Sequence, residues 1–342
     1  MPEIEPTTLK KDRLTTEASI QYAKDVFSQK LAQYLKLTKV SSPIMVMDGT
    51  GVNDDLNGVE RCVRFAIKQM DDQHAVVVNS LAKWKRIRLH DFEIDEDQGI
   101  LTDMRAIRPD EDYSPIHSVY VDQWDWEKRI SPQDRTLARL KSEVRNIYQA
   151  MKDTERELHQ RYPGEVKKLP EDITFIHAEE LRRIYPDLTA KERENKIAFE
   201  HGAVFIIGIG GRLEDNQIHD GRAPDYDDWS TENEEGFHGL NGDLLVWNPV
   251  LESAFELSSM GIRVDRTALL KQLELRSEQH RKDLYFHQLL LQDKLPQSIG
   301  GGIGQSRLCM YLLGKRHIGE VQVSVWPEQA YQEAKVLGIE LM

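Results

Sequence analysis

Residues 108–127 combine the kinds of polar side chain that bind small ligands. Arg108 offers a forked cation, and Glu111 offers a carboxylate three positions later in a proline-containing loop. The following run, SPIHSVYVDQWDWE, is rich in Val, Tyr and Trp and is typical of a β-strand, so Gln123 and Asp125 should share one face. Polar groups on a largely apolar face are costly unless they are hydrogen-bonded. The stretch is therefore either a surface hairpin with solvated charges or the floor of a ligand site.

Two glycine-rich stretches could bring backbone close to a phosphate. Residues 203–211, AVFIIGIGG, resemble the start of a dinucleotide-binding fold, but the fingerprint fails at Leu213. The phosphate-loop pattern also fails, because no glycine precedes Lys-Ser or Lys-Thr in the required frame. Residues 297–307, QSIGGGIGQSR, lead into an apolar helix with Arg307 in its first turn, where its fork could hold a phosphate. The alternative is a purely structural glycine turn.

Further cations stand near predicted helix ends and loops. Ser80 is a candidate N-cap for a helix that carries Lys85 one turn inside, and helix N-termini attract anions. Arg222 lies in an acidic loop, residues 219–231, where solvated charge is the simpler interpretation. Asp243 and Glu256 flank a predicted hairpin that could bring two carboxylates together. Hard oxygen ligands of this kind suit Mg²⁺ shared with triphosphate oxygens.

The predicted helices and strands must position these residues, and they do not alternate regularly along the chain. The apolar spacing predicts helices over about 16–37 and 133–161, the first ended by Ser41-Ser42-Pro43, and a capping box at Thr189–Glu192 opens a third helix that ends near Gly202. Residues 74–80 and 203–211 are typical of buried strands, and residues 48–58 of a turn-rich loop. Because helices and strands do not alternate, we predict an α+β fold.

The composition limits the function. The chain has 342 residues, 39% of them hydrophobic and 30% charged, and a net charge of −13, which argues against broad binding to nucleic acid. Cys62 and Cys309 form no CxxC pair, so neither zinc nor a disulfide framework is indicated, and we expect both to be small buried hydrophobes. There is neither a signal-peptide core nor an apolar run of about 20 residues. We expect a cytoplasmic protein that does not bind membranes.

Taken in order, these motifs resemble the three-motif core of class II aminoacyl-tRNA synthetases. The pattern is Pro43 after a helix, Arg108-x-x-Glu111 before a strand, Glu256, and GGGIGQSR ending at Arg307. The Gln-Trp-Asp run of residues 123–125 is closest to the aspartyl and asparaginyl branch. The segments SLAKWKR, RPDEDYSPIHSVYVDQWDWE, RAPDYDDWS and LNGDLLVWNPVLESAFELSSMGIRV resemble still more closely the ammonia-dependent asparagine synthetases, or aspartate–ammonia ligases. This resemblance covers roughly residues 16–327.

The resemblance departs from the family at one loop. Residues 48–58, DGTGVNDDLNG, form a longer loop than is usual, which leaves open whether Asn53, Asp54 or Asp55 takes the family's loop-carboxylate position. The ligase is favoured over a tRNA synthetase because the first core helix begins near residue 16 and the chain ends soon after Arg307. We therefore expect a loose segment over 1–15 and a single catalytic domain over 16–342 that binds no nucleic acid.

The resemblance implies a two-step reaction. ATP would adenylate the side chain of L-aspartate with release of pyrophosphate, and ammonia would attack β-aspartyl-AMP to give asparagine and AMP. It also implies individual roles. Those on the nucleotide side are Arg108 at the α-phosphate, Arg307 at the adenine face and outer phosphates, Glu111 at the adenine amino group, Ser259 and Gly304 beside the nucleotide, and Asp243 and Glu256 on Mg²⁺. Those on the amino-acid side are Asp125 and Gln123 at the ammonium group, Lys85 and Arg222 at the carboxylates, and Ser80, Ser118 and Asp122 as neighbours. Asp54 would attract ammonium and take its proton.

The resemblance also implies an architecture. We expect an antiparallel sheet of about six to eight strands flanked by helices, in a homodimer whose contact includes the helix that ends at Pro43. Two alternatives stay open: a free-standing enzyme that forms aspartyl-adenylate for another acceptor, and an inactive regulatory paralogue. The second should lack one of the arginines or acids, yet all of them are present.

Overall fold

The computed structural model describes residues 6–54, 60–162 and 168–342. Its centre is an eight-stranded sheet in the order β1-β5-β6-β11-β10-β9-β8-β7. The strands are β1 Leu37–Lys39, β5 Gly99–Ile107, β6 Tyr120–Arg129, β11 Ser298–Gly304, β10 Ser253–Ile262, β9 Asn241–Asn248, β8 Ala203–Ile207 and β7 Thr174–His177. The five inner pairings are antiparallel, and the edge pairs β1–β5 and β7–β8 are parallel. The predicted α+β class with a mainly antiparallel sheet is confirmed.

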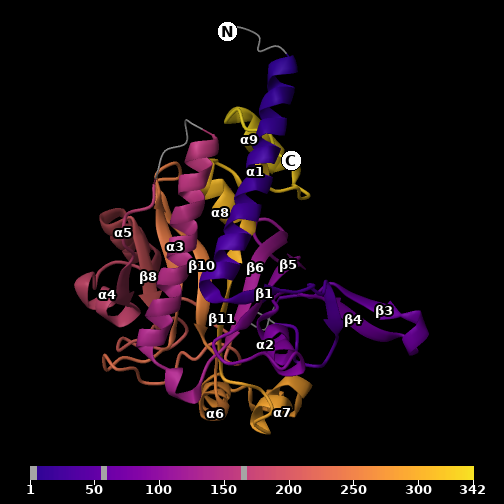
Figure 1. The fold of residues 1–342 in the computed structure, drawn as a ribbon, viewed down its shortest axis with the longest axis vertical. Helices are drawn as coiled ribbons and strands as arrows, with labels where there is room; N and C mark the ends of the chain where they lie inside the picture. Colours follow the sequence, from indigo (N-terminus) through magenta and orange to yellow (C-terminus); the bar gives the residue numbers. More distant parts are fainter. Residues whose placement is uncertain (1–5, 55–59, 163–167) are drawn as a thin grey trace.

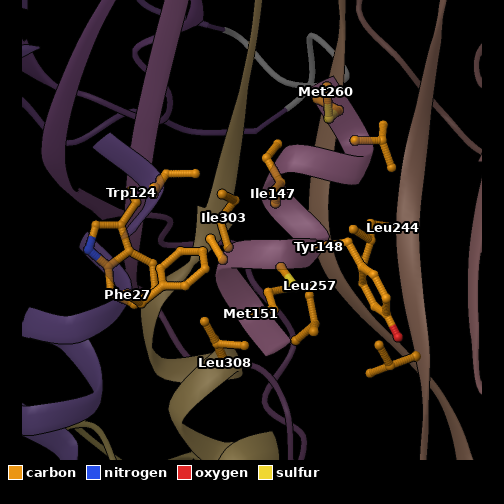
Figure 2. Close-up of a cluster of buried hydrophobic side chains, with 14 of the residues drawn as sticks. Phe27, Trp124, Ile147, Tyr148, Met151, Leu244, Leu257, Met260, Ile303 and Leu308 are labelled. Atoms are coloured by element: carbon orange, nitrogen blue, oxygen red, sulfur yellow. The ribbon is translucent and has the colours of Figure 1, made fainter. Parts of the chain in front are cut away.

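One face of this sheet is covered by helices. The helices α1 Pro6–Leu35, α3 Leu137–Arg161 and α8 Gln305–Leu312 lie against it (Figure 1). Phe27 of α1 packs on Trp124 of β6 with ring centroids 4.6 Å apart, and Met151 of α3 lies in the same apolar layer (Figure 2). The predicted apolar stripe of α3 is buried: Leu137, Leu140, Val144, Ile147 and Met151. Because side chains alternate along a strand, this layer leaves Gln123, Asp125 and Glu127 of β6 on the opposite face.

Smaller elements surround the opposite face and the edges. Strands β2 Met45–Met47, β4 Gln73–Val77 and β3 Arg64–Ile67 form a three-stranded antiparallel sheet that projects from one side (Figure 1). The remaining helices are α2 Ala82–Asp91, α4 Ala178–Ile184, α5 Ala190–His201, α6 Arg266–Leu275, α7 Tyr285–Leu291 and α9 Glu328–Val336. Short 3₁₀ turns occupy Lys68–Met70, Pro132–Asp134, Gln279–Asp283 and Ile318–Glu320. Among the described residues, none of the helices combines the length and hydropathy needed to span a membrane.

Both predicted ends of the first helix are wrong. Helix α1 begins at Pro6 rather than near residue 16, so most of the segment expected to be loose is helical, and residues 1–5 lie outside the description. The helix also ends before the Ser-Ser-Pro stretch, because Lys36 adopts a left-handed conformation with φ of 57° and β1 follows. Helix α2 begins at Ala82 with Leu81 in the cap position, and Ser80 Oγ accepts a hydrogen bond from the amide of Ala82 at 3.2 Å.

The glycines of the stretch 297–307 lie in a strand rather than in a turn. Residues 298–304 form β11 between β6 and β10, and the chain then enters α8 with Arg307 in its first turn, as predicted. The capping box at the start of α5 is confirmed, because the Thr189 hydroxyl accepts from the amide of Glu192 and the helix ends at Gly202 with φ of 76°.

Candidate active site

Two adjoining cavities lie on the polar face of the large sheet. The larger has a volume of about 570 Å³ and the smaller about 380 Å³. They share walls formed by Arg108, Glu111, His117, Gln123, Glu256, Ser259 and Gly302. Of the remaining predicted residues, the larger cavity adds Asp54, Ser80, Lys85, Asp125 and Arg222, and the smaller adds Ser118, Asp122, Gly304 and Arg307. Residues far apart in sequence therefore meet at one continuous site, and Asp243 lies behind it in contact with Arg222.

The glycines of β11 make room for the polar side chains of its neighbours. A Cβ atom on Gly300 would lie 2.0 Å from Glu127 Oε2, and one on Gly302 would lie 2.6 Å from Gln123 Oε1. Gly302 pairs with Asp125 across the β6–β11 ladder. Side chains at these positions would displace the polar groups of β6. The glycine run thus lets the side chains of neighbouring strands approach closely, whereas the approach of its backbone to a phosphate stays a prediction.

A buried ion pair forms one end of the larger cavity. The Lys85 ammonium group contacts Asp125 Oδ1 and donates a hydrogen bond to the carbonyl of Gly301 at 3.0 Å. Both side chains are almost fully buried, and burial lowers the pKa of Lys85 although Asp125 opposes the change. Asp125 Oδ2 has no hydrogen-bond partner among the described residues. A buried carboxylate oxygen without a donor is suited to accept from a ligand, and an ammonium group supplies such donors.

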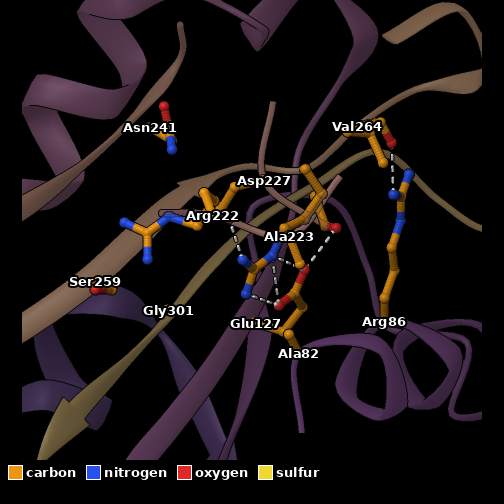
Figure 3. A network of polar contacts seen from close by, with 12 residues as sticks. Ala82, Arg86, Glu127, Arg222, Ala223, Asp227, Asn241, Ser259, Val264 and Gly301 are labelled. Carbon is orange, nitrogen blue, oxygen red and sulfur yellow. Dashed lines mark hydrogen bonds and ion pairs between the residues drawn. The ribbon is translucent and has the colours of Figure 1, made fainter. Parts of the chain in front are cut away.

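Acids and arginines alternate in a second group of buried ion pairs, part of which Figure 3 shows. Arg263 donates to Glu127 Oε2 at 2.8 Å, and its other terminal nitrogen contacts Asp227. Arg222 Nε lies 3.5 Å from Asp227 Oδ2, and its Nη2 contacts Asp243 Oδ1. Arg222 is therefore anchored between two carboxylates rather than solvated, which decides against the simpler interpretation of the acidic loop.

A register shift brings two acids to the same side of the sheet. Glu256 pairs with Leu245 and Ser258 with Leu244, so the strand slips between these positions. Ser259 Oγ consequently lies 3.2 Å from Glu256 Oε1 and 2.7 Å from Asp243 Oδ1. Burial, with the nearby Glu256 carboxylate, raises the pKa of Asp243 to about 6 in spite of Arg222.

This carboxylate pair suits a cation that is shared with a substrate. Within residues 6–54, 60–162 and 168–342, no group of three or more His, Cys, Asp or Glu side chains could hold a metal ion. Mg²⁺ commonly binds through one or two carboxylates and substrate phosphates instead of a full protein cage. The hard oxygens of Asp243 and Glu256 and the raised pKa of Asp243 both fit that mode of binding.

Two arginines and a histidine mark the other end of the site. Arg108 donates to the carbonyl of Asn79 at 3.2 Å, with its Nη1 3.9 Å from Glu111 Oε2. Arg307 Nη2 lies 2.8 Å from His117 Nε2, and its Nη1 donates to the carbonyl of Glu256 at 3.1 Å. Because arginine only donates, His117 Nε2 must accept. The sequence motifs assigned His117 no role.

The protonation state of His117 follows from these contacts. Its Nδ1 lies 2.8 Å from Ser114 Oγ, so the neutral ring carries its proton on Nδ1 and donates to the hydroxyl. Burial and the adjacent Arg307 guanidinium lower the pKa of His117 to about 4. At neutral pH the imidazole therefore accepts from Arg307 without opposing its charge.

Two side chains predicted to neighbour the substrate are hydrogen-bonded to other groups of the protein. The Ser118 hydroxyl donates to Gln322 Oε1 at 2.6 Å. Asp122 Oδ1 accepts from the amide of Ser306 at 3.0 Å, and Oδ2 accepts from Lys24 Nζ at 2.9 Å. Both line the smaller cavity, away from Asp125, so the expected contact of Ser118 and Asp122 with the amino-acid substrate is not supported.

Among its described residues, the connection between β2 and β3 contributes two acids to the larger cavity, Asp54 and Glu60. Asp54 is buried in its wall beside Tyr226, whose pKa is raised by burial and then by Asp54. Asn53 Oδ1 accepts from the amide of Asn79 at 2.8 Å, which gives it a structural contact. Asp55, the third candidate, lies outside the described residues.

The two cysteines differ from each other. Cys309 is buried in the apolar layer, as predicted. Cys62 is only partly buried, and its sulfur accepts from the side-chain amides of Asn53 and Asn79 at 3.5 and 3.4 Å. The prediction of a buried apolar role is therefore wrong for Cys62, because the loop that carries it lies in a polar region.

The topology and the position of the site define the class II aminoacyl-tRNA synthetase catalytic fold. Asparaginyl-tRNA synthetase from Pyrococcus horikoshii, complexed with asparaginyl-adenylate, superposes with a TM-score of 0.67 at 15% identity, covering 95% of this chain and 74% of that one. Aspartyl-tRNA synthetase from Entamoeba histolytica superposes with a TM-score of 0.59 at 13% identity, covering 94% and 62%. At these identities the likeness concerns the fold.

Sequence comparison identifies the family within that class. The family model described as aspartate-ammonia ligase matches residues 14–338. An aspartate–ammonia ligase from Parabacteroides distasonis is 55% identical over 327 residues, covering 96% of this chain and 95% of the relative. One from Clostridium perfringens is 54% identical with the same coverage. The chain belongs to the aspartate–ammonia ligase family, and the resemblance drawn from its motifs is confirmed.

Proposed function

We propose that this protein joins L-aspartate and ammonia at the cost of ATP, releasing L-asparagine, AMP and pyrophosphate through β-aspartyl-AMP. The observation that carries the proposal is the placement of two chemically different ends in one continuous site. Lys85 and Asp125 form an end suited to an amino acid, and Arg108 and Arg307 form an end suited to a nucleotide. A carboxylate of the first ligand can therefore meet a phosphate of the second.

In the first step the aspartate side chain attacks the α-phosphorus, and pyrophosphate leaves. Arg108 stabilises the charge that builds on the α-phosphate, because a preorganised cation needs little reorganisation during the reaction. Asp125 Oδ2 accepts from the substrate's ammonium group, with Gln123 beside it. Lys85 and Arg222 serve the substrate carboxylates, Glu111 faces the adenine amino group, and Ser80, Ser259 and Gly304 line the site. Arg307 holds the adenine face and the outer phosphates.

Asp243 and Glu256 would hold Mg²⁺ together with phosphate oxygens. The ion would supply positive charge to the triphosphate as pyrophosphate departs. Arg222 orients Asp243 toward this position, and Ser259 joins the two carboxylates.

In the second step ammonia attacks the acyl carbon of β-aspartyl-AMP, and AMP leaves. Ammonia is mostly protonated at neutral pH, so an acid near the acyl carbon should attract ammonium and remove its proton. Asp54 is our candidate because, of the two described acids that the β2–β3 connection places in the larger cavity, Asp54 and Glu60, it is the buried one. Nearby Tyr226 keeps its phenol proton and is available as a donor.

A reaction with the pure protein tests the proposal. Incubation with aspartate, ATP, Mg²⁺ and ammonium should yield AMP and asparagine in equal amounts. ADP as the product, or glutamine as the better nitrogen donor, would overturn it. The alternative of another acceptor for aspartyl-adenylate predicts that ammonium is dispensable once that acceptor is present. Strict dependence of AMP release on ammonium separates the two.

We also propose a homodimer whose contact includes the chain around Pro43. Ile44 and Met45 follow this residue and have 51% and 45% of their surface exposed, which is unusual for neighbouring large apolar side chains. Light scattering should give twice the monomer mass. The cytoplasmic location and the lack of nucleic-acid binding stay predictions from the sequence.

A further inference from the structure

Helix α8, which carries Arg307, is capped at its N-terminus by a side chain of strand β6. Helix α8 starts after Gly304, and in the described part of the chain no side chain at its own cap position bonds its first turn. The amide of Ser306, next to Arg307, donates instead to Asp122 Oδ1 of β6 at 3.0 Å. A carboxylate at a helix N-terminus satisfies an open amide and interacts favourably with the helix dipole. The start of this helix therefore depends on Asp122.

Asp122 is in turn paired with the N-terminal helix. Its Oδ2 accepts from Lys24 Nζ of α1 at 2.9 Å, and the carboxylate is 6% exposed whereas the lysine side chain is 25% exposed. Both oxygens are thus engaged, one by α8 and one by α1. A buried carboxylate with a single neutral partner would be costly, and the Lys24 ammonium compensates its charge.

Further contacts hold the same helical turn. Gln305 Nε2 donates to Asp103 Oδ1 at 3.1 Å and to the carbonyl of Gln123 at 3.2 Å. Ser306 Oγ accepts from Gln322, whose amide oxygen accepts from Ser118. The turn that directs Arg307 into the smaller cavity is consequently set by side chains from other elements, and of the two carboxylates among them Asp122 is the one that bonds the helix backbone.

We propose that Asp122 and Lys24 are positioning residues for the nucleotide, acting through the first turn of α8 on Arg307. This proposal rests on the proposed function, in which Arg307 binds ATP. Loss of either group lets the turn shift and misplaces the guanidinium relative to His117 Nε2 and the carbonyl of Glu256, which it now contacts. The amino-acid end is spared, because Lys85 and Asp125 are held by each other and by Gly301.

Three substitutions separate the cap from the ion pair. Asp122→Ala removes both, Asp122→Asn keeps an acceptor for the Ser306 amide, and Lys24→Met removes the ion pair alone. We expect KM for ATP to rise by roughly fivefold to tenfold in Asp122→Ala, the change that corresponds to a lost helix cap. Asp122→Asn and Lys24→Met should show smaller rises of about twofold to fivefold. KM for aspartate and for ammonium should stay within about twofold in all three, on the same scale.

Lys30→Met is the matched control. Lys30 lies on the same helix, and its Nζ pairs with Glu157 Oε1 at 2.9 Å with comparable exposure, but it faces α3 instead of α8. Its substitution should leave every KM unchanged. A general loosening of α1 would instead affect Lys30→Met and Lys24→Met alike.

A double-mutant cycle distinguishes positioning from simple loss of stability. If Asp122 acts through Arg307, Asp122→Ala should raise KM for ATP no further in a protein that already carries Arg307→Met. Additive effects would overturn the proposal, as would an unchanged KM for ATP in the Asp122 and Lys24 variants. If Asp122→Ala does not fold, Asp122→Asn and Lys24→Met decide.

Failure of the proposed function has a separate signature. Should Arg307→Met itself leave KM for ATP and aspartate-dependent pyrophosphate exchange unchanged, the assignment of Arg307 to the nucleotide fails. If Arg307→Met raises KM for ATP but the Asp122 and Lys24 variants do not, only the positioning role fails.

Discussion

Asp243 should lower the stability of the folded protein at the pH at which the enzyme works. Its side chain is 10% exposed, and burial with the neighbouring Glu256 raises its pKa to about 6. The folded protein therefore binds this proton more tightly than the unfolded chain, whose Asp pKa is about 3.9. By linkage, the contribution of this group to stability falls as pH rises from about 4 to about 6 and stays low above that.

The structure gives an upper bound for the effect of Asp243→Asn. A pKa raised from about 3.9 to about 6 corresponds to about 3 kcal/mol, at about 1.4 kcal/mol per pKa unit. Asparagine keeps an oxygen that can accept from Ser259 Oγ and from Arg222, so the substitution removes the charge with little loss of hydrogen bonding. The variant should be more stable than the parent by up to about 3 kcal/mol at pH 8 and nearly equal to it near pH 4.

Urea unfolding at pH 5, 6 and 8 with EDTA present would measure this difference. Asp97→Asn is a control for which the expected change in stability has the opposite sign. Burial alone would raise the pKa of Asp97, but hydrogen bonds from Lys36, Arg139 and Lys128 hold this pKa below its usual range. That substitution should destabilise the protein at pH 8. Added Mg²⁺ should stabilise the parent but not Asp243→Asn. If Asp243→Asn is no more stable than the parent at pH 8, the charged form of Asp243 does not destabilise the folded protein and the explanation is wrong.

Four further outcomes follow from the site. Arg108→Lys loses the forked contact and should reduce aspartate-dependent pyrophosphate exchange by about a hundredfold or more; unchanged exchange would remove Arg108 from the chemistry. Asp54→Asn should retain this exchange while asparagine formation slows by at least about a hundredfold, and a normal rate from preformed adenylate would refute its role as base. Excess EDTA should abolish activity and Mg²⁺ should restore it, whereas activity that survives chelation contradicts the metal proposal. Lys85→Met leaves Asp125 buried without its cation and should cost about 3–5 kcal/mol of unfolding free energy, measured in urea; full stability would show that water reaches the pair.

Local patterns in the sequence predicted the parts of the site that lie on one strand. Alternation along β6 is enough to put Gln123 and Asp125 on one face, and both line the larger cavity. The stripe of α3 was predictable for the same reason, since its spacing reflects a single buried face.

Features that depend on strand register or on contacts between residues far apart in sequence could not be predicted from local patterns. Glu256 and Ser259 share a side because of a bulge, and a bulge leaves no periodic signal. His117 meets Arg307 across 190 positions, and Lys24 meets Asp122 across 98. The first residues of α1, from Pro6, carry no apolar stripe, so their sequence gives no helical signal.

The glycines of β11 also determine in which direction the site can be redesigned. Gly302 lines both cavities and Gly301 the larger one, so this part of the floor carries no side chain that could be trimmed to gain depth. Substitution at Gly302 can only reduce the volume, since a single added carbon already reaches Gln123. Room for a bulkier amino acid would have to come from the walls, for example at Ser80. Mutagenesis to broaden the range of acceptable substrates should therefore vary the wall residues and leave the glycines of β11 unchanged.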